Sequence, residues 1–252
     1  MKLIYVGFAL ICVFLFITTF AQQKNSIFDF SQKVIDECIK VHGGKKYNKA
    51  HYSYDFRDKS YEYQRDGGNY TYTRTYTDKQ DNQLKDVLNN NSYAHFINGV
   101  HDTDISPKKE FTYKEGVNSV HYFAFLPYFL NDNAVNKKYL GLVDIKGKKY
   151  HEIEVRFDQE GGGVDHEDIY VYWIQDKTFT LDYLAYSFKV NGGGVRFREA
   201  YNPRKVGDIR FQDYVNYKHE DKTTPVQELY QAFINGDLKE LSKIELKNIK
   251  KL

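Results

Sequence analysis

The chain has 252 residues, of which 41% are hydrophobic, and a formal net charge of +2 at pH 7. This length suits one globular domain, or at most two, with a sizeable core. The near balance of charges excludes a strongly basic nucleic-acid surface and an acidic tail. The 23 Tyr and 18 Phe, against only 4 Pro, favour β-strands over helices or disorder.

Residues 1–21 have the pattern of a signal peptide. An uncharged apolar run from Leu3 to Phe20 ends in Thr19 and Ala21, which supply the small residues of a cleavage site. We therefore expect export, and a mature chain of residues 22–252 that forms a single domain with no transmembrane segment. The alternative is an uncleaved membrane anchor, because the run is about long enough to span a bilayer.

The first helix of the mature chain is predicted between residues 27 and 41, where apolar residues recur at helical spacing. Cys38 lies in this pattern, is the single cysteine left after cleavage, and is expected to be buried without a disulfide. The segment HGGKKY, residues 42–47, follows. A phosphate-binding loop would place its glycines before a helix. We interpret the segment as a helix end, with Gly43 in the left-handed conformation and His42 favourably placed in the helix dipole.

Strands are predicted next. Residues 51–56 and 60–77 alternate aromatic with polar side chains, which is typical of strands with one buried face. The Asp-Gly-Gly turn at residues 66–68 predicts an antiparallel hairpin. Residues 84–105 are interpreted as shorter strands with turns.

Residues 117–130 differ from this pattern because they are apolar on nearly every side and are interrupted by Pro127. A helix that is apolar all round must be buried. We expect this inner helix to lie against the sheet, with four side chains facing the aromatic residues of later strands: Val120, Phe123, Ala124 and Leu126.

Strand-like segments continue from residue 137 to residue 218, separated by turn signals at residues 146–148, 161–163, 176–177, 192–194 and 203–207. A helical tail is predicted over about residues 225–252. The fold class predicted is α+β: a curved antiparallel sheet, forming an unclosed β-barrel, with helices packed in its concave face and an N-terminal helix.

The cluster GGGVDHED is the best candidate for chemistry. His166 and Asp168 would share one face of a strand, and their types suit acid-base or metal chemistry. Neighbouring strand residues point to opposite faces, however, so we interpret the cluster as a polar turn. We predict no catalytic residue, no metal and no cofactor.

Two further groups of side chains suit ligand binding. Arg196 and Arg198 share one strand face and could hold a carboxylate or phosphate headgroup, or could lie on a solvated outer face. Tyr172, Trp173 and Tyr183 suit the mouth of a cavity, although ordinary sheet packing would use them equally well.

The order of elements, with the segments YVYWI, TLDYLAY, RFREAY and GDIRFQDY, resembles an uncharacterised family of exported bacterial proteins of Bacteroidetes type. That family is in turn similar to the lipoprotein-carrier fold of LolA, LppX and RseB. The resemblance implies a curved, unclosed sheet with helices in its concavity and a space that accepts acyl chains. Fold alone does not carry function.

The function predicted is that of an exported cell-envelope protein that holds a lipid or other apolar ligand between the curved sheet and the inner helix. The location would be the periplasm or outer envelope of a Gram-negative bacterium, or outside the cell. One alternative is a structural or signalling protein that binds an envelope protein partner. The other is a hydrolase or metal-dependent enzyme centred on His166. The candidate ligand-binding residues are Val120, Phe123, Ala124, Leu126, Tyr172, Trp173, Tyr183, Arg196 and Arg198.

Export makes a direct prediction about the mature N-terminus. Because Thr19 and Ala21 form the expected cleavage site, N-terminal sequencing of the natural protein should begin at Gln22. A natural product that still begins at Met1 would identify a membrane-anchored protein instead.

Overall fold

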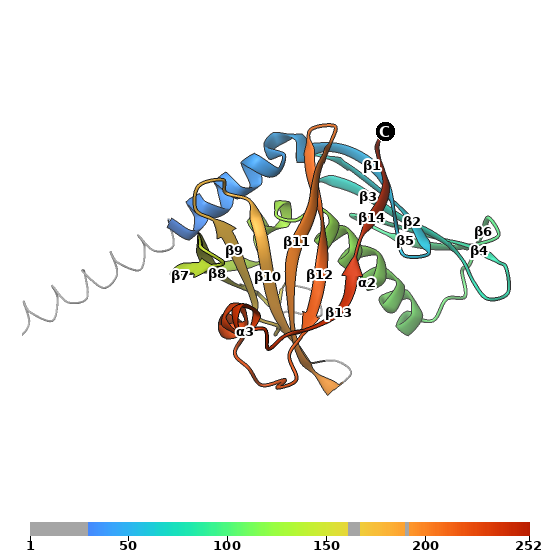
Figure 1. Ribbon diagram of the computed structural model, residues 1–252. Helices are drawn as coiled ribbons and strands as arrows, with labels where there is room; N and C mark the ends of the chain where they lie inside the picture. Colours follow the sequence, from blue (N-terminus) through green and yellow to red (C-terminus); the bar gives the residue numbers. More distant parts are fainter. Residues whose placement is uncertain (1–29, 161–166, 190–191) are drawn as a thin grey trace, which may run out of the picture.

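The computed structural model describes residues 30–160, 167–189 and 192–252. The expected signal peptide and His166 lie outside these described residues. Within them, fourteen strands form two seven-stranded antiparallel sheets. Figure 1 shows the strands of the two sheets running in different directions, with α2 beneath one sheet and α3 against the other.

The first sheet contains the tyrosine-rich part of the chain. Its strands, from edge to edge, are β14 (Leu246–Lys251), β1 (Lys49–Phe56), β2 (Lys59–Asp66), β3 (Asn69–Thr77), β4 (Gln83–Asn89), β5 (Tyr93–Ile97) and β6 (Val100–His101). The predicted hairpin is confirmed, with its turn at Gly67 and Gly68 between β2 and β3. Alternate residues of β1 and β2 are buried, as the period-two pattern predicted.

The second sheet contains the later strands. Its order is β13 (Lys239–Ile244), β12 (Ile209–Lys218), β11 (Gly194–Val206), β10 (Leu181–Phe188), β9 (Tyr170–Gln175), β8 (Lys148–Phe157) and β7 (Val135–Ile145). The predicted turn between residues 203 and 207 is wrong in part, because β11 continues to Val206. The pairing of β11 shifts between Tyr201 and Arg204, and a proline, which lacks an N–H, is tolerated at such an irregularity.

β13 and β14 follow each other in the chain but belong to different sheets. β13 pairs with β12, β14 pairs with β1, and Glu245 lies between them. The N–H of Leu246 donates to Asp213 Oδ1 (3.0 Å), and the Leu246 carbonyl accepts from Arg204 (2.6 Å). Asp213 is 3% exposed and also accepts from Arg204 at 3.0 Å. We call this crossing the seam between the sheets.

The predicted helical tail is therefore wrong beyond residue 235. Helix is confined to a 3-10 turn, Val226–Glu228, and to α3, Leu229–Asn235. Gly236 adopts φ 82°, which ends α3 in the left-handed conformation. The residues that follow form strands, because β12 and β1 offer backbone groups that would otherwise be unpaired.

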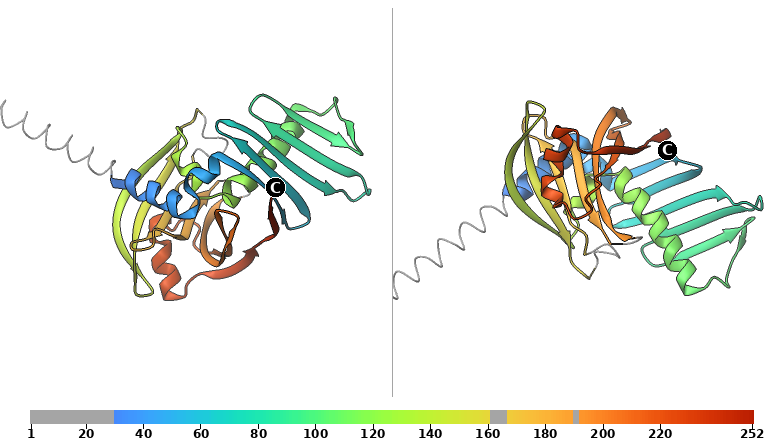
Figure 2. Two further views of the ribbon diagram at one scale, coloured as in Figure 1. Left: turned by 90° about the horizontal axis from the view of Figure 1, so that it is seen from above. Right: turned by 60° about the horizontal axis from the view of Figure 1, so that its bottom comes forward.

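The predicted α+β class is confirmed, with helices against unclosed antiparallel sheets. The sheet expected as one is divided into two at the seam. Figure 2 shows α2 lying along the first sheet, while α3 lies against the second.

The inner helix differs from its prediction in extent and in exposure. α2 spans Pro107–Ala124, with the Ser106 side chain accepting from the N–H of Lys109 (3.5 Å). It therefore begins ten residues earlier than the apolar run, and its first half is largely exposed. The rest of the apolar run leaves the helix at Phe125 and continues as a 3-10 turn, Tyr128–Asn131.

The N-terminal helix covers residues 30–42 of the described chain, and HGGKKY ends it as predicted. The left-handed residue is Gly44 (φ 55°) rather than Gly43. Gly43 is constrained by space, since a Cβ there would approach Ile209 Cγ1 to 3.2 Å. Burial lowers the pKa of His42 to about 3, so this side chain is neutral and cannot serve the helix dipole as a cation. It accepts the N–H of Leu181 instead (3.2 Å).

The buried side chains form three clusters. The inner face of the second sheet packs on the N-terminal helix, and the expected burial of Cys38 is confirmed there. The inner face of the first sheet packs on the C-terminal half of α2 through its tyrosines. The outer face of the second sheet is covered by the 3-10 turn and α3. Much of the aromatic surplus is therefore core packing.

His121 of α2 lies at the centre of the tyrosine cluster. Its ring is 4.7–5.7 Å from the rings of Tyr54, Tyr61, Tyr63 and Tyr72. Tyr54 Oη lies 2.7 Å from His121 Nδ1. Burial lowers the pKa of His121 to about 3, as it does for His42.

This burial predicts acid sensitivity. Between pH 6.5 and pH 3 the unfolded chain binds a proton at His121 that the folded chain does not bind, so stability is lost as pH falls through this window. The loss is about 1.4 kcal/mol per pH unit for each such histidine. In denaturant melts between pH 7 and pH 4.5, His121→Asn should reduce the slope of unfolding free energy against pH by about one proton. An unchanged slope would show that His121 is protonated in the folded state.

Candidate functional site

A cavity of about 230 Å³ lies between the C-terminal half of α2 and the seam. It is partly open to solvent, and its lining is mainly apolar. The lining residues are Phe56, Arg57, Ser119, Val120, Phe123, Ala124, Arg198, Gln212, Tyr214, Ile244 and Leu246.

Both sheets and one helix build this cavity. Val120, Phe123 and Ala124 are three to four residues apart or adjacent on α2, so one side of the last helical turns faces the space. The opposite wall comes from β11, β12, β13 and β14. Ile244 and Leu246 stand on either side of the crossing from one sheet to the other. The strands of the tail thus form one wall of the site.

Arg198 is the buried charge of the cavity. It is 8% exposed, and its Nη2 donates to Tyr186 Oη at 3.1 Å. Its guanidinium carbon lies 4.4 Å from the Phe123 ring centroid and 5.1 Å from that of Tyr186, both within cation–π range. Its Nε has no hydrogen-bond partner among the described residues. Phe123 therefore belongs to the apolar wall and also contacts the guanidinium of Arg198.

Gln212 is the second buried polar group of the lining, at 7% exposure. Its Nε2 donates to the Leu181 carbonyl (2.7 Å) and to Tyr214 Oη (2.8 Å). Its Oε1 has no partner within the described part of the chain. Two side chains of the lining thus each carry one buried polar atom without a partner among the described residues.

The structure brings together four of the candidate residues: Val120, Phe123, Ala124 and Arg198. Leu126 lies in the neighbouring core at 4% exposure, and Tyr172 is fully buried on the inner face of the second sheet. Phe123 faces the Tyr186 ring of the later strand β10, with ring centroids 6.1 Å apart, while Val120 and Ala124 also pack on the tyrosine cluster of the first sheet.

Three candidates lie elsewhere. Trp173 and Tyr183 belong to the cluster on the outer face, with Tyr230 and Phe233 of α3 as ring neighbours. They fail as cavity residues because neighbours in a strand alternate faces, and Tyr172 takes the inner one. Arg196 shares a face with Arg198, as predicted, but it lies 4.6 Å over the Phe188 ring and does not line the cavity.

Sequence reasoning missed the strand residues of the cavity wall. Gln212 and Tyr214 share a face of β12 by their spacing, but only the pairing of β12 with β11 brings this face to the same side of the sheet as Arg198, which is opposite Asn216. Ile244 and Leu246 lie in the segment for which the sequence predicts a helical tail. Arg57 and Phe56 at the end of β1 carried no signal that separated them from the other strand ends.

Asp168, the described member of the polar cluster, is buried at 6% exposure and does not line this cavity. Among the described residues, no group of three or more His, Cys, Asp or Glu side chains is arranged to hold a metal ion. No helix in the same part of the chain is long and apolar enough to cross a membrane.

Comparison with known proteins identifies the family of this chain. Residues 7–246 match the model of a family of unknown function (DUF6503). The chain belongs to this family. The predicted membership of an uncharacterised family is thus confirmed. No curated protein matches the chain in sequence.

Solved structures of low sequence identity are similar to this DUF6503 chain. A LolA superfamily protein from Nitrosomonas europaea is 9% identical, with a TM-score of 0.47 over 87% of this chain and 92% of that one. A DUF1329 family protein from Desulfovibrio piger is 8% identical (TM-score 0.40, 88% and 92% covered). A domain named for outer membrane lipoprotein sorting from Vibrio parahaemolyticus is 7% identical (TM-score 0.43, 88% and 93% covered).

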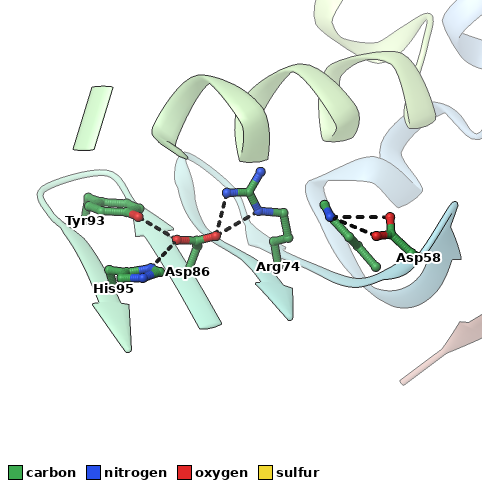
Figure 3. Close-up of polar contacts among 6 residues, drawn as sticks. Asp58, Arg74, Asp86, Tyr93 and His95 are labelled. Atoms are coloured by element: carbon green, nitrogen blue, oxygen red, sulfur yellow. Dashed lines mark hydrogen bonds and ion pairs between the residues drawn. The ribbon is translucent and has the colours of Figure 1, made fainter. Parts of the chain in front are cut away.

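A separate buried ion-pair network lies under α2, at the strands β3 to β5 (Figure 3). Asp86 is fully buried, and its Oδ2 accepts from Nε (2.8 Å) and Nη2 (2.6 Å) of Arg74. Its Oδ1 accepts from Tyr93 Oη (2.5 Å) and pairs with His95 Nδ1 (2.8 Å). The residue types would suit acid-base chemistry. Both carboxylate oxygens are satisfied, however, and none of the four residues lines the cavity, so we interpret the network as structural.

Gly116 of α2 is the point where this network meets the helix. A Cβ at Gly116 would lie 2.5 Å from Nη1 of Arg74, and Arg74 is fixed by its two bonds to Asp86. The missing side chain therefore lets α2 approach the first sheet closely.

This contact reverses the usual effect of a helical glycine. Gly116→Ala should destabilise the protein by about 1–3 kcal/mol through overpacking, although alanine in an open helix position gains about 1 kcal/mol. In an Arg74→Ala background the same substitution should become neutral or stabilising. Urea melts of the four proteins of this cycle measure the coupling. Equal effects in both backgrounds would show that Arg74 does not limit the approach of α2.

Proposed function

We propose that this protein binds a lipid or other apolar ligand in the cavity between α2 and the seam, as an exported protein of the cell envelope. The observation that carries the proposal is the cavity itself, with an apolar lining from α2 and from both sheets and one buried arginine. The export pattern of residues 1–21 supports the location.

The size of the cavity supports an apolar guest. An engineered protein cavity of about 150 Å³ lined by apolar side chains stays dry and binds benzene. The present cavity, at about 230 Å³, exceeds that volume and opens to solvent on one side. It can therefore accept a short acyl chain, or the end of a longer chain whose remainder lies outside.

The open side also suits exchange of the ligand. Ser119 and Arg57 are exposed lining residues, so the entrance is polar while the deeper wall is apolar. Ligand sites of proteins commonly combine an apolar lining with a few placed polar groups. Binding and release would need no opening of the tyrosine core beneath α2.

Phe123 and Phe125 provide a matched test of this reading. Phe125 is fully buried and stacks on Tyr63 with ring centroids 3.7 Å apart, so Phe125→Ala should cost about 3–5 kcal/mol. Phe123 borders an existing space, so Phe123→Ala should cost clearly less than Phe125→Ala and should change the affinity for an apolar probe. Urea melts give the stabilities, and fluorescence titration with N-phenyl-1-naphthylamine, a neutral probe, gives the affinities.

A substitution that fills the space completes the test. Val120→Phe should reduce probe affinity about tenfold or more, because the larger ring occupies the cavity. If the parent protein does not bind the probe at any concentration tested, and Phe123→Ala costs as much as Phe125→Ala, the space is ordinary core and the proposal is wrong.

A further inference from the structure

The cavity contains a positive charge that the described protein does not neutralise. Arg198 is 8% exposed, and an arginine side chain keeps its charge at every physiological pH. No described carboxylate forms an ion pair with it, and the described residues that line the cavity include Arg57 but no acid. Burying a charge without an opposite charge is costly unless other groups compensate.

The compensation within the protein is partial. The rings of Phe123 and Tyr186 and the Tyr186 hydroxyl account for the contacts of the guanidinium. Cation–π contacts attract the guanidinium to the rings but supply no opposite charge. Nε of Arg198 remains without an acceptor among the described residues, although it is buried. Because the Arg198 side chain lines the cavity, an anionic group of a ligand can supply the missing opposite charge.

Gln212 is a second buried polar side chain of the same lining. Its Nε2 donates to the Leu181 carbonyl and to Tyr214 Oη, which fixes the orientation of the amide. Its Oε1 has no partner in the described chain. Arg198 pairs with Asn216 of β12, so Gln212 lies further along the same wall, beyond Tyr214. An anionic headgroup would pair with Arg198, while Gln212 adds a polar group elsewhere in the lining.

Resting on the proposed function, we infer that the ligand is an anionic amphiphile: an apolar chain that ends in a carboxylate or a phosphate, with the anion held by Arg198 and the chain placed against Val120, Phe123 and Ala124. Arg57 at the entrance adds a second positive charge toward the same end of the ligand. A neutral or cationic amphiphile of the same chain length lacks the group that the buried guanidinium requires.

Four ligands of equal chain length test this assignment: decanoate, decyl phosphate, decanol and decyltrimethylammonium. Each is titrated against the protein loaded with N-phenyl-1-naphthylamine, at fixed ionic strength and below the concentration at which the amphiphile forms micelles. We expect both anions to displace the neutral probe about tenfold or more better than decanol, and the cation to be the weakest. The stronger of the two anions identifies the headgroup as carboxylate or phosphate.

Arg198→Met should remove the preference for the anions while the probe and decanol still bind. Arg196→Met is the matched control: this arginine lies on the same face of the same strand but outside the cavity, over Phe188, so the preference should persist. Circular dichroism checks that each variant is folded. If Arg198→Met does not fold, the four ligands titrated against the parent protein still show whether the site prefers an anionic headgroup.

Failure of this inference differs from failure of the proposed function. Equal displacement by decanol and by the two anions, with the probe bound, would overturn the anionic headgroup and leave an apolar site in place. Absence of probe binding, and of any amphiphile binding by calorimetry, would overturn both. A preference for anions that survives in Arg198→Met and is lost in Arg196→Met would place the headgroup at the wrong arginine and would also overturn the assignment.

Discussion

The crossing of the C-terminal tail from one sheet to the other depends on a single buried carboxylate. Asp213 accepts the N–H of Leu246 at the point where the ladder of β12 with β13 ends, and Arg204 binds both Asp213 and the Leu246 carbonyl. These side chains supply hydrogen bonds that strands normally supply to each other. Because both sheets end at this crossing, their edges are held close enough to share one cavity wall.

The cavity is a consequence of that division. One continuous ladder would bring neighbouring strands to about 4.8 Å throughout and would fill the space with paired side chains. At the seam the backbone pairing is interrupted, and α2 covers the gap from the inside with Val120, Phe123 and Ala124. The close approach of α2 in turn depends on Gly116 above Arg74. Two arginine–aspartate pairs, each with a buried carboxylate, thus position the helix and the seam.

Much of this fold was readable from the sequence, because strand periodicity and glycine turns are local signals. The hairpin at Gly67 and Gly68, the helix end at HGGKKY and the buried Cys38 follow from such signals. The prediction of a helical C-terminal tail is wrong because it, too, rests on local signals. Residues 239–251 are rich in lysine and glutamate, which favour helices locally, and only the edges of two distant strands make them β-structure. Non-local pairing overrode local propensity.

The candidate site shows the same difference between local and non-local signals. Residues predicted on one helix could be grouped from spacing alone, and three of the four candidates in that segment line the cavity. Residues on strands could not, because a face is known only when the partner strand and its register are known. Tyr172 and Trp173 show the difficulty, since adjacent positions with similar chemistry lie on opposite faces of the sheet. The sequence predicts Arg196 and Arg198 together, as two arginines on one strand face, and does not separate them. The meaning of Arg198 comes from the register, which places an unpaired cation in the same space as the apolar side chains of α2.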